Sequence, residues 1–430
     1  MAKKFLQFIL KLAAKLVLWR HRPVVVAITG SVGKTSTKEA IYEVLRKKFL
    51  VGKSRGNYNN ELGLPLAVLG AESGRRSVLL WLMVFIKFFF RLFSRRYPQI
   101  LVLEMGADRP GDIDYLTKIA RPTISVVTRV GRVHLEFFES PEDLQKEKSR
   151  IVSALPQEGT AVLNADDPKV LAMRHATAGT VLTYGLGAEA EVRAEDILIF
   201  YETKAEQLNP ETDIGTRFII NFKGKKRLLT RHGILGTPAV YAALAAFCVG
   251  KSLGMTAEEI ISGLKKFRTP PGRLRLLLGI KKSLILDDSY NSSPEAAVEA
   301  VRVLRQIRAR RRIAVLGDML ELGPETESAH RQIGRLVKDL GIDLLFTVGP
   351  KAKFIAEEAR RCGFAKTKIF EFNSSQTAAL PLQNKIREGD VVLVKGSQGV
   401  RMEKIVLEVM AEPERAPELL CRQGREWQKR

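Results

Sequence analysis

One short stretch near the start of the chain constrains the fold most. The apolar run Val24–Thr29 leads into the sequence TGSVGKTS, and a helical pattern, Thr35–Lys48, follows it. A strand, a glycine-containing loop and a helix in this order are typical of a P-loop. The full pattern has one more glycine, where this chain has Ile28, so the loop is a shorter variant. The sequence predicts phosphate binding by Gly30, Ser31, Gly33, Lys34, Thr35 and Ser36.

Strand-like and helical stretches alternate after this loop. Ile100–Glu104, Thr123–Thr128 and Thr160–Asn164 are short runs rich in β-branched residues, with helical patterns such as Pro141–Leu155 between several of them. This alternation predicts a parallel sheet covered by helices. Residues 190–230 alternate apolar and polar side chains, as a small antiparallel insert does. A Pro-rich linker at 268–273 and a second strand–helix series complete the predicted fold class, α/β: a central P-loop ATPase domain with that insert, then a Rossmann-like C-terminal α/β domain.

The charge of the chain is unusual. Seventy Lys and Arg residues against 47 Asp and Glu residues give a net charge of +23. Such an excess indicates an acidic partner: nucleic acid, an anionic membrane or a phosphorylated substrate. The cysteines Cys248, Cys362 and Cys421 have no CxxC spacing, which argues against a zinc site or a disulfide framework and favours a reducing cytosol.

Several further blocks identify a family. They are GNYNNELGLPLAVL (56–69), LEMGADRPGDIDYL (103–116), HLEFFES with KEKSRI (134–151), VLNADD (162–167), DDSYNSSP (287–294), AVLGDMLELG (314–323) and GDVVLVKGSQGVRMEK (389–404). Together with the P-loop they resemble the Mur ligases of peptidoglycan precursor synthesis, over roughly residues 23–412. The resemblance implies an ATP-dependent ligase that activates a muramyl-peptide carboxylate as an acyl phosphate and joins it to D-alanyl-D-alanine, or to a similar dipeptide or amino-acid amine.

The resemblance also divides the chain into parts. It implies a central ATP-binding domain at 23–271, with an apolar insert at about 77–96, and a C-terminal domain at 272–412. Residues 1–22 are expected to form a basic amphipathic helix and residues 413–430 a charged tail.

The family's metal site implies four residues here. Thr35, Glu104 and His134 match its Mg²⁺ ligands, and Lys148 matches a lysine that CO₂ converts into a carbamate, an anion with oxygen donors. With Lys34, the residues Glu104, His134 and Lys148 are the expected catalytic groups. Lys146 is the alternative to Lys148 if the register differs, and a solvated helix lysine is the structural alternative.

The remaining implied residues lie on both sides of the linker. Arg273 and Asp288 match positions near the ATP phosphates and ribose. Asn59 and Asn60 match a substrate-side loop. Lys395 and Ser397 match a loop near the incoming amine.

The chain departs from the family in two ways that bear on binding. The family normally carries a domain of about a hundred residues before the P-loop, which holds the UDP-sugar, whereas only Met1–Arg22 precede the strand here. The family's His and Asn around adenine correspond to positions in GTPAVYAALAA (236–246), where this chain has Pro238, Ala239 and Ala242. We therefore expect altered recognition of both the carrier and the adenine.

Two added apolar stretches are a third departure. Residues 3–19 carry Lys4, Lys11 and Lys15, and residues 77–96 carry Lys87, Arg91 and Arg95. Both patterns predict basic amphipathic helices rather than membrane spans. They are expected either to pack on each other, to form a dimer face, or to lie on an anionic membrane. The expected location is cytoplasmic, with peripheral attachment to the inner membrane face as the membrane alternative.

Two other functions compete with the ligase. A catalytically weak, nucleotide-binding pseudo-ligase that scaffolds wall synthesis at the membrane would fit the altered adenine positions. A nucleic-acid-binding ATPase would fit the net charge alone, but no platform of interleaved aromatic and basic residues supports it. We therefore expect no nucleic acid as a partner.

Overall fold

The computed structural model describes residues 2–56, 58–75, 77–131, 136–138, 140–202, 209–424 and 427. Its first sheet is parallel as far as β7 and antiparallel from β7 to β9. In spatial order its strands are β2 (Val51–Lys53), β3 (Ile100–Glu104), β1 (Val24–Thr29), β4 (Ile124–Val127), β5 (Thr160–Asn164), β6 (Thr180–Gly185), β7 (Val192–Tyr201), β8 (Ile214–Phe222) and β9 (Lys225–His232).

Helices cover both faces of this sheet, because its central strands are apolar on both sides. In β1, Val26 and Ile28 point into one core cluster, and Val25 and Ala27 point into the other. The first cluster is closed by α2 (Lys34–Leu45), α8 (Thr237–Ser252) and α9 (Ala257–Leu264). The second is closed by α1 (Ala2–His21), α3 (Gly63–Leu69), α4 (Val78–Phe93), α5 (Asp112–Ile119), α6 (Pro141–Ser153), α7 (Pro168–Leu171) and the 3₁₀ helix η1 (Ala172–Ala176).

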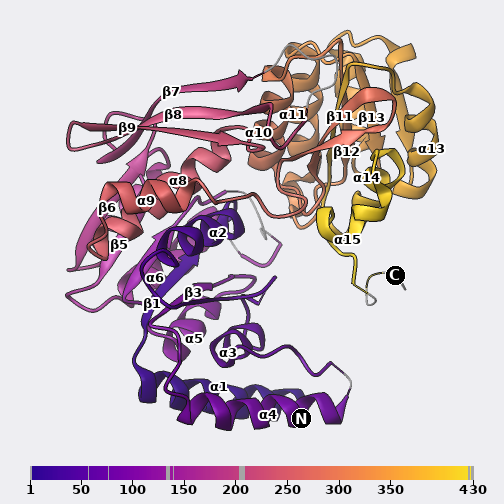
Figure 1. The fold of residues 1–430 in the computed structure, drawn as a ribbon. Helices are drawn as coiled ribbons and strands as arrows, with labels where there is room; N and C mark the ends of the chain where they lie inside the picture. Colours follow the sequence, from indigo (N-terminus) through magenta and orange to yellow (C-terminus); the bar gives the residue numbers. More distant parts are fainter. Residues whose placement is uncertain are drawn as a thin grey trace.

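The second sheet lies at the other end of the molecule (Figure 1). Its order is β10 (Arg275–Gly279), β11 (Ser283–Asp288), β15 (Asp390–Lys395), β12 (Arg311–Gly317), β13 (Leu344–Val348) and β14 (Ile369–Phe372), all parallel except β10. One face carries α10 (Pro294–Gln306), α11 (Thr326–Asp339) and α12 (Lys353–Arg361). The other carries α13 (Ser375–Lys385), α14 (Glu403–Val409) and α15 (Ala416–Leu419). Short 3₁₀ helices are η2 (Ile280–Lys282), η3 (Gly323–Glu325), η4 (Lys366–Lys368), η5 (Gln398–Val400) and η6 (Pro413–Arg415).

The predicted fold class is confirmed: two α/β units, the first with an antiparallel extension formed by β7, β8 and β9. The segment from residue 413, expected as a charged tail, packs against the second unit over its first part. Leu419 and Leu420 pack into the C-terminal core, and Nη1 of Arg422 lies 2.8 Å from Oε2 of Glu403 in a buried ion pair. These contacts bury charged and apolar groups together, which average composition cannot reveal.

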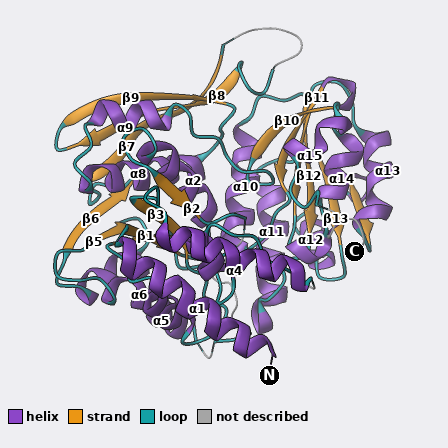
Figure 2. Cartoon of the chain, turned by 60° about the horizontal axis from the view of Figure 1, so that its bottom comes forward, coloured by secondary structure: helices purple, strands orange, loops and turns teal. Residues whose placement is uncertain are grey.

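The two added apolar stretches form α1 and α4, which lie beside each other at the end of the molecule farthest from the second sheet (Figures 1 and 2). Neither they nor any other helix of the described residues combines the length and the hydropathy that a membrane span requires.

Candidate active site

The loop predicted to bind phosphate connects β1 to α2. Gly30 has φ 140°, and a Cβ on it would stand 2.0 Å from Oγ1 of Thr128, so a side chain does not fit there. Gly33, at φ 89°, is the N-cap of α2, which begins at Lys34. The free N–H groups of the first helical turn and the positive end of the helix dipole therefore face the loop, which suits an anion.

Two neighbouring strand ends brace this loop. Oγ1 of Thr128, after β4, donates to the backbone oxygen of Val32 at 2.6 Å. Nδ2 of Asn164, at the end of β5, donates to the backbone oxygen of Thr128 at 2.8 Å. The backbone N–H of Ser31 donates to the backbone oxygen of Arg129 at 2.6 Å. The ends of β4 and β5 thus hold the loop in shape, which lowers the cost of ordering it on binding.

Glu104 ends β3, the strand next to β1, and its carboxylate reaches the start of α2. Oγ1 of Thr35 donates to Oε2 of Glu104 at 3.3 Å. Nζ of Lys38, one helical turn after Lys34, lies 2.9 Å from Oε1 of Glu104, and both side chains are almost completely buried. The contact between Nζ of Lys38 and Oε1 of Glu104 is an ion pair that lacks the geometry of a hydrogen bond. A hydroxyl and a carboxylate, both oxygen donors, thus converge beside the loop.

This arrangement fits Mg²⁺, which prefers oxygen ligands and is usually held by one or two protein groups plus phosphate and water. Among the described residues, no three His, Cys, Asp or Glu side chains gather into a metal-binding group. His134, the third ligand implied by the family, lies outside the described residues. The fit therefore rests on Thr35 and Glu104.

Lys148 lies on α6, and its side chain is 1% exposed. Burial, followed by the nearby charge of Lys34, lowers the pKa of Lys148 to about 7. Lys146, the alternative in register, is 77% exposed and pairs with Asp143 at 3.4 Å. The structure therefore separates the two lysines: Lys148 points toward the phosphate loop and Lys146 toward solvent.

A cleft that is partly open to solvent joins this loop to the second sheet. Its lining includes Thr35 from the first unit and Arg273, Asp288 and Lys395 from the second. Nζ of Lys395 lies 2.5 Å from Oδ2 of Asp288. Burial raises the pKa of Asp288 and lowers that of Lys395, and their ion pair opposes both shifts. Burial also lowers the pKa of Lys34, and the positive charge of Arg273 lowers it further, so two cations face the same space.

The part of the cleft lined by α8 has apolar and aromatic walls. Pro238 and Ala239 line it, with the rings of Tyr184 and Tyr241. The hydroxyl of Tyr241 donates to Oδ2 of Asp166 at 2.7 Å, which fixes that ring. These walls form a surface on which a planar base can stack.

Asn59 and Asn60 line a separate pocket with Asp108, Arg109 and, from the second unit, Glu321. Oδ1 of Asn60 accepts a hydrogen bond from the backbone N–H of Gly63 at 2.9 Å, so that side chain holds the start of α3. Ser397 holds the loop that brings Glu321 to this pocket, because its Oγ accepts a hydrogen bond from the backbone N–H of the neighbouring Leu320 at 2.9 Å.

The structure thus places the predicted residues in two neighbouring regions. Thr35, Arg273, Asp288 and Lys395 meet around the cleft, whereas Asn59, Asn60 and the loop held by Ser397 border the second pocket.

Sequence reasoning missed Lys38, Thr128 and Asn164. The spacing of Lys38, four residues after Lys34, was the available signal, since it places both lysines on one face of α2. The sequence gives no comparable sign that the ends of β4 and β5 brace the loop, because the strand order is not readable from it.

Comparison with known proteins identifies the family. The Mur ligase middle domain matches residues 28–80 and 84–250, and the Mur ligase glutamate ligase domain matches residues 272–398. The UDP-N-acetylmuramoyl-tripeptide–D-alanyl-D-alanine ligase of Bacillus subtilis is 30% identical over 390 residues, covering 90% of this chain and 76% of that protein. The Escherichia coli enzyme of the same name is 30% identical over 403 residues, covering 91% and 78%.

Solved structures agree with this assignment. The MurF ligase of Thermotoga maritima in complex with ADP superposes with a TM-score of 0.77 at 28% identity, covering 95% of this chain and 84% of that one. MurF from Acinetobacter baumannii gives a TM-score of 0.76 at 26% identity, covering 93% and 79%. With the loop, the acidic strand end and the cleft between two α/β units in place, the chain belongs to the Mur ligase family of ATP-dependent, amide-bond-forming enzymes.

Proposed function

We propose that this chain joins the carboxylate of a muramyl-type peptide to D-alanyl-D-alanine or a similar amine at the expense of ATP. The observation that carries the proposal is the cleft in which Thr35 of the P-loop faces Arg273, Asp288 and Lys395, while Glu104 accepts a hydrogen bond from Thr35. The names of the similar proteins supply the two substrates.

The proposed reaction has two steps. A peptide carboxylate oxygen attacks the γ-phosphorus of ATP, the bond to the β–γ bridging oxygen breaks, and ADP leaves. The amine nitrogen then attacks the acyl carbon, the bond to the phosphate oxygen breaks, and the nitrogen loses a proton, giving the amide and phosphate. Lys34 and Arg273 stabilise the charge of the transferring phosphoryl group, and the preformed loop orients it.

Mg²⁺, when bound, would neutralise the phosphates. We propose Thr35 and Glu104 as its protein ligands, with His134 and Lys148 of the family's set completing the site. In this assignment Ser31 of the loop and Ser36 in the first turn of α2 contact the phosphates, and the aromatic wall beside Pro238 takes the adenine.

We further propose that Lys148 carries a carbamate. The neutral amine adds to the carbon of CO₂, a C–N bond forms, and a proton leaves. A pKa of about 7 supports this, because a substantial share of the amine is neutral near pH 7. The product anion would offset the positive charge of Lys34.

The test is ADP release by the purified chain with Mg²⁺, measured with both substrates and with each omitted. We expect release to require a UDP-muramyl tripeptide, or its lipid-linked counterpart, together with D-alanyl-D-alanine. ATP binding without ADP release under any combination would favour the pseudo-ligase. Release stimulated by DNA or RNA alone would favour the nucleic-acid ATPase.

For location, we propose an enzyme that draws on cytoplasmic ATP and works peripherally at the inner face of a membrane. The adjacent helices α1 and α4, with their exposed apolar side chains, support the peripheral attachment to the membrane.

A further inference from the structure

Helix α1 has two apolar faces. Its inner face is part of the core, where Leu10, Ala14 and Val17 are 0% exposed. Its outer face is a stripe repeating every three or four residues, with exposures from 42% to 67%: Phe5, Phe8, Leu12, Leu16 and Trp19. A helix that packed on the core alone would be polar on its outer face.

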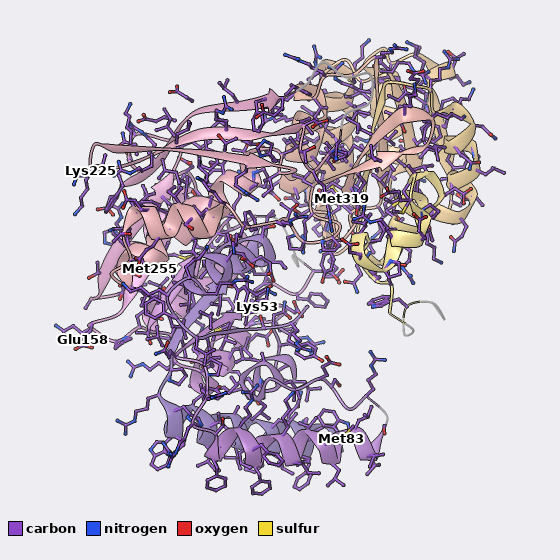
Figure 3. All side chains as sticks on the ribbon, in the orientation of Figure 1. Lys53, Met83, Glu158, Lys225, Met255 and Met319 are labelled. Atoms are coloured by element: carbon purple, nitrogen blue, oxygen red, sulfur yellow. The ribbon has the colours of Figure 1, made fainter. Side chains whose placement is uncertain are left out.

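Helix α4 repeats this design. Val84 is 4% exposed, and Trp81, Phe88 and Leu92 pack against the same core as α1. The opposite face carries apolar side chains that are at least half exposed: Leu79, Leu82, Met83, Phe89, Phe90 and Phe93. Figure 3 labels Met83 on this helix.

The two helices form one surface. In Figure 2 they lie beside each other on the face turned toward the viewer, with no other element over them. Nε2 of His21, at the end of α1, lies 2.8 Å from the backbone oxygen of Arg91 near the end of α4. The ring of His21 also stacks on Tyr97 at 4.4 Å. These contacts fix the position of the second helix relative to the first.

The two segments that form this surface carry charge of one sign. Residues 1–22 contain six Lys and Arg residues, residues 73–99 contain six, and neither segment contains Asp or Glu. Lys4, Lys15 and Arg20 are exposed and fall on the two borders of the apolar stripe of α1 by helical periodicity. On α4, Lys87 is exposed at the border of the apolar stripe.

We propose that α1 and α4 together form a docking surface for an anionic lipid bilayer. Aromatic and aliphatic side chains of both helices enter the interface between headgroups and acyl chains, and the basic residues on the borders contact anionic headgroups. Two copies pairing face to face would instead bring two sets of basic residues together without acidic partners, so charge favours lipid over a second copy. The surface goes beyond the ligase chemistry, because none of its residues lines the cleft.

The first experiment measures co-flotation with vesicles of phosphatidylcholine alone or mixed with phosphatidylglycerol. We compare the full chain with Phe89→Asp/Phe93→Asp, whose side chains are 58% and 75% exposed, so the fold does not depend on them. The matched control is Leu198→Asp/Leu228→Asp, at 61% and 59% exposure on β7 and β9. We expect at least a hundredfold weaker partitioning for the α4 variant only, since burying each Phe contributes about 1.5 kcal/mol or more.

The second experiment reverses charge. Lys4→Glu/Lys15→Glu/Arg20→Glu should weaken binding to anionic vesicles at least a hundredfold, at about 1 kcal/mol for each basic residue. Binding should also weaken as salt shortens the Debye length from about 10 Å to about 3 Å. Lys366→Glu/Lys368→Glu, at the far end of the molecule, should bind as the unchanged chain does.

Three results would overturn the proposal. The unchanged chain could stay unbound with anionic vesicles at low salt, or both control variants could lose binding as strongly as the test variants. Light scattering could also show a dimer that Phe89→Asp/Phe93→Asp abolishes, with no vesicle binding, which would identify a contact between copies. ADP release in solution should be the same for all these variants, so a failed docking proposal and a failed ligase proposal are distinguishable.

Discussion

Replacing Lys38 by methionine tests the arrangement of the site most directly. Lys38 is the cation that faces Glu104 at 2.9 Å, and the side chains are 1% and 3% exposed. Methionine keeps most of the volume and removes the charge, so the carboxylate of Glu104 stays buried without its partner. Breaking a buried ion pair in this way destabilises a protein by about 3–5 kcal/mol.

The expected change is large enough for thermal unfolding. At about 2–4 °C per kcal/mol for a domain of this size, Lys38→Met should lower the melting temperature by about 6–20 °C without Mg²⁺. Lys118→Met is the matched control, because Lys118 pairs with Asp114 while 65% exposed. An exposed pair of this spacing contributes only about 0.3–0.5 kcal/mol, so its loss should shift the melting temperature by about 2 °C at most.

The double variant Lys38→Met/Glu104→Gln isolates the cause. It removes the unpaired charge as well and should recover much of the stability that Lys38→Met loses. Mg²⁺ should raise the melting temperature of Lys38→Met more than that of the unchanged chain, since a bound cation replaces the missing charge. A double variant as unstable as the single one, or a Lys38→Met protein that melts like the unchanged chain, would refute this account of the pair.

Two further predictions concern lysines beside the phosphate loop. Lys34→Ala should abolish ADP release while the melting temperature stays close to that of the unchanged chain; activity above about a tenth would contradict its role at the phosphates. Lys148→Ala should also lose activity, and formate or acetate should partly restore it. In the unchanged chain, added bicarbonate should increase activity as the pH rises through 7, and Lys148→Ala should lack this increase. Burial lowers the pKa of Lys148 from 10.5 to about 7 in the folded chain, so between these two pH values the unfolded chain binds one more proton than the folded chain. The free energy of unfolding should therefore increase with pH across this window in the unchanged chain, relative to Lys148→Ala. If the stability of the two proteins depends on pH in the same way, the lowered pKa of Lys148 is contradicted.

The sequence predicts well whatever depends on neighbours along the chain. The strands at Val24–Thr29, Ile100–Glu104 and Thr160–Asn164 are found with the predicted bounds, because each is a short β-branched run between clear breaks. The loop and the start of α2 follow from local glycine and helix chemistry in the same way.

What could not be predicted depends on contacts across the fold. The strand order β2-β3-β1-β4 puts Glu104 beside the P-loop, and nothing local to residue 104 encodes that order. Nothing local to Lys38 encodes its burial either, because its partner Glu104 lies at the end of β3 and not on its own helix. The segment after residue 413 looks charged on average, yet Arg422 is 9% exposed because Glu403 lies at its guanidinium.

The docking surface and the substrate side of the site are joined by one short stretch of chain. The loop with Asn59 leads into α3, the next helix is α4, and the strand after α4 ends at Glu104. A pocket lined by Arg55, Glu72, Lys87 and Met83 lies between this loop and α4, so charged and apolar walls stand side by side, with Arg55 paired to Glu72. Docking through α4 would bring this pocket to the headgroups, where a phosphate-bearing lipid carrier presents both a charge and a chain. We therefore propose a membrane-bound glycopeptide, rather than a freely diffusing nucleotide sugar, as the substrate. A UDP-linked tripeptide that supports the same rate of ADP release as its lipid-linked counterpart on anionic vesicles would argue against this choice of carrier.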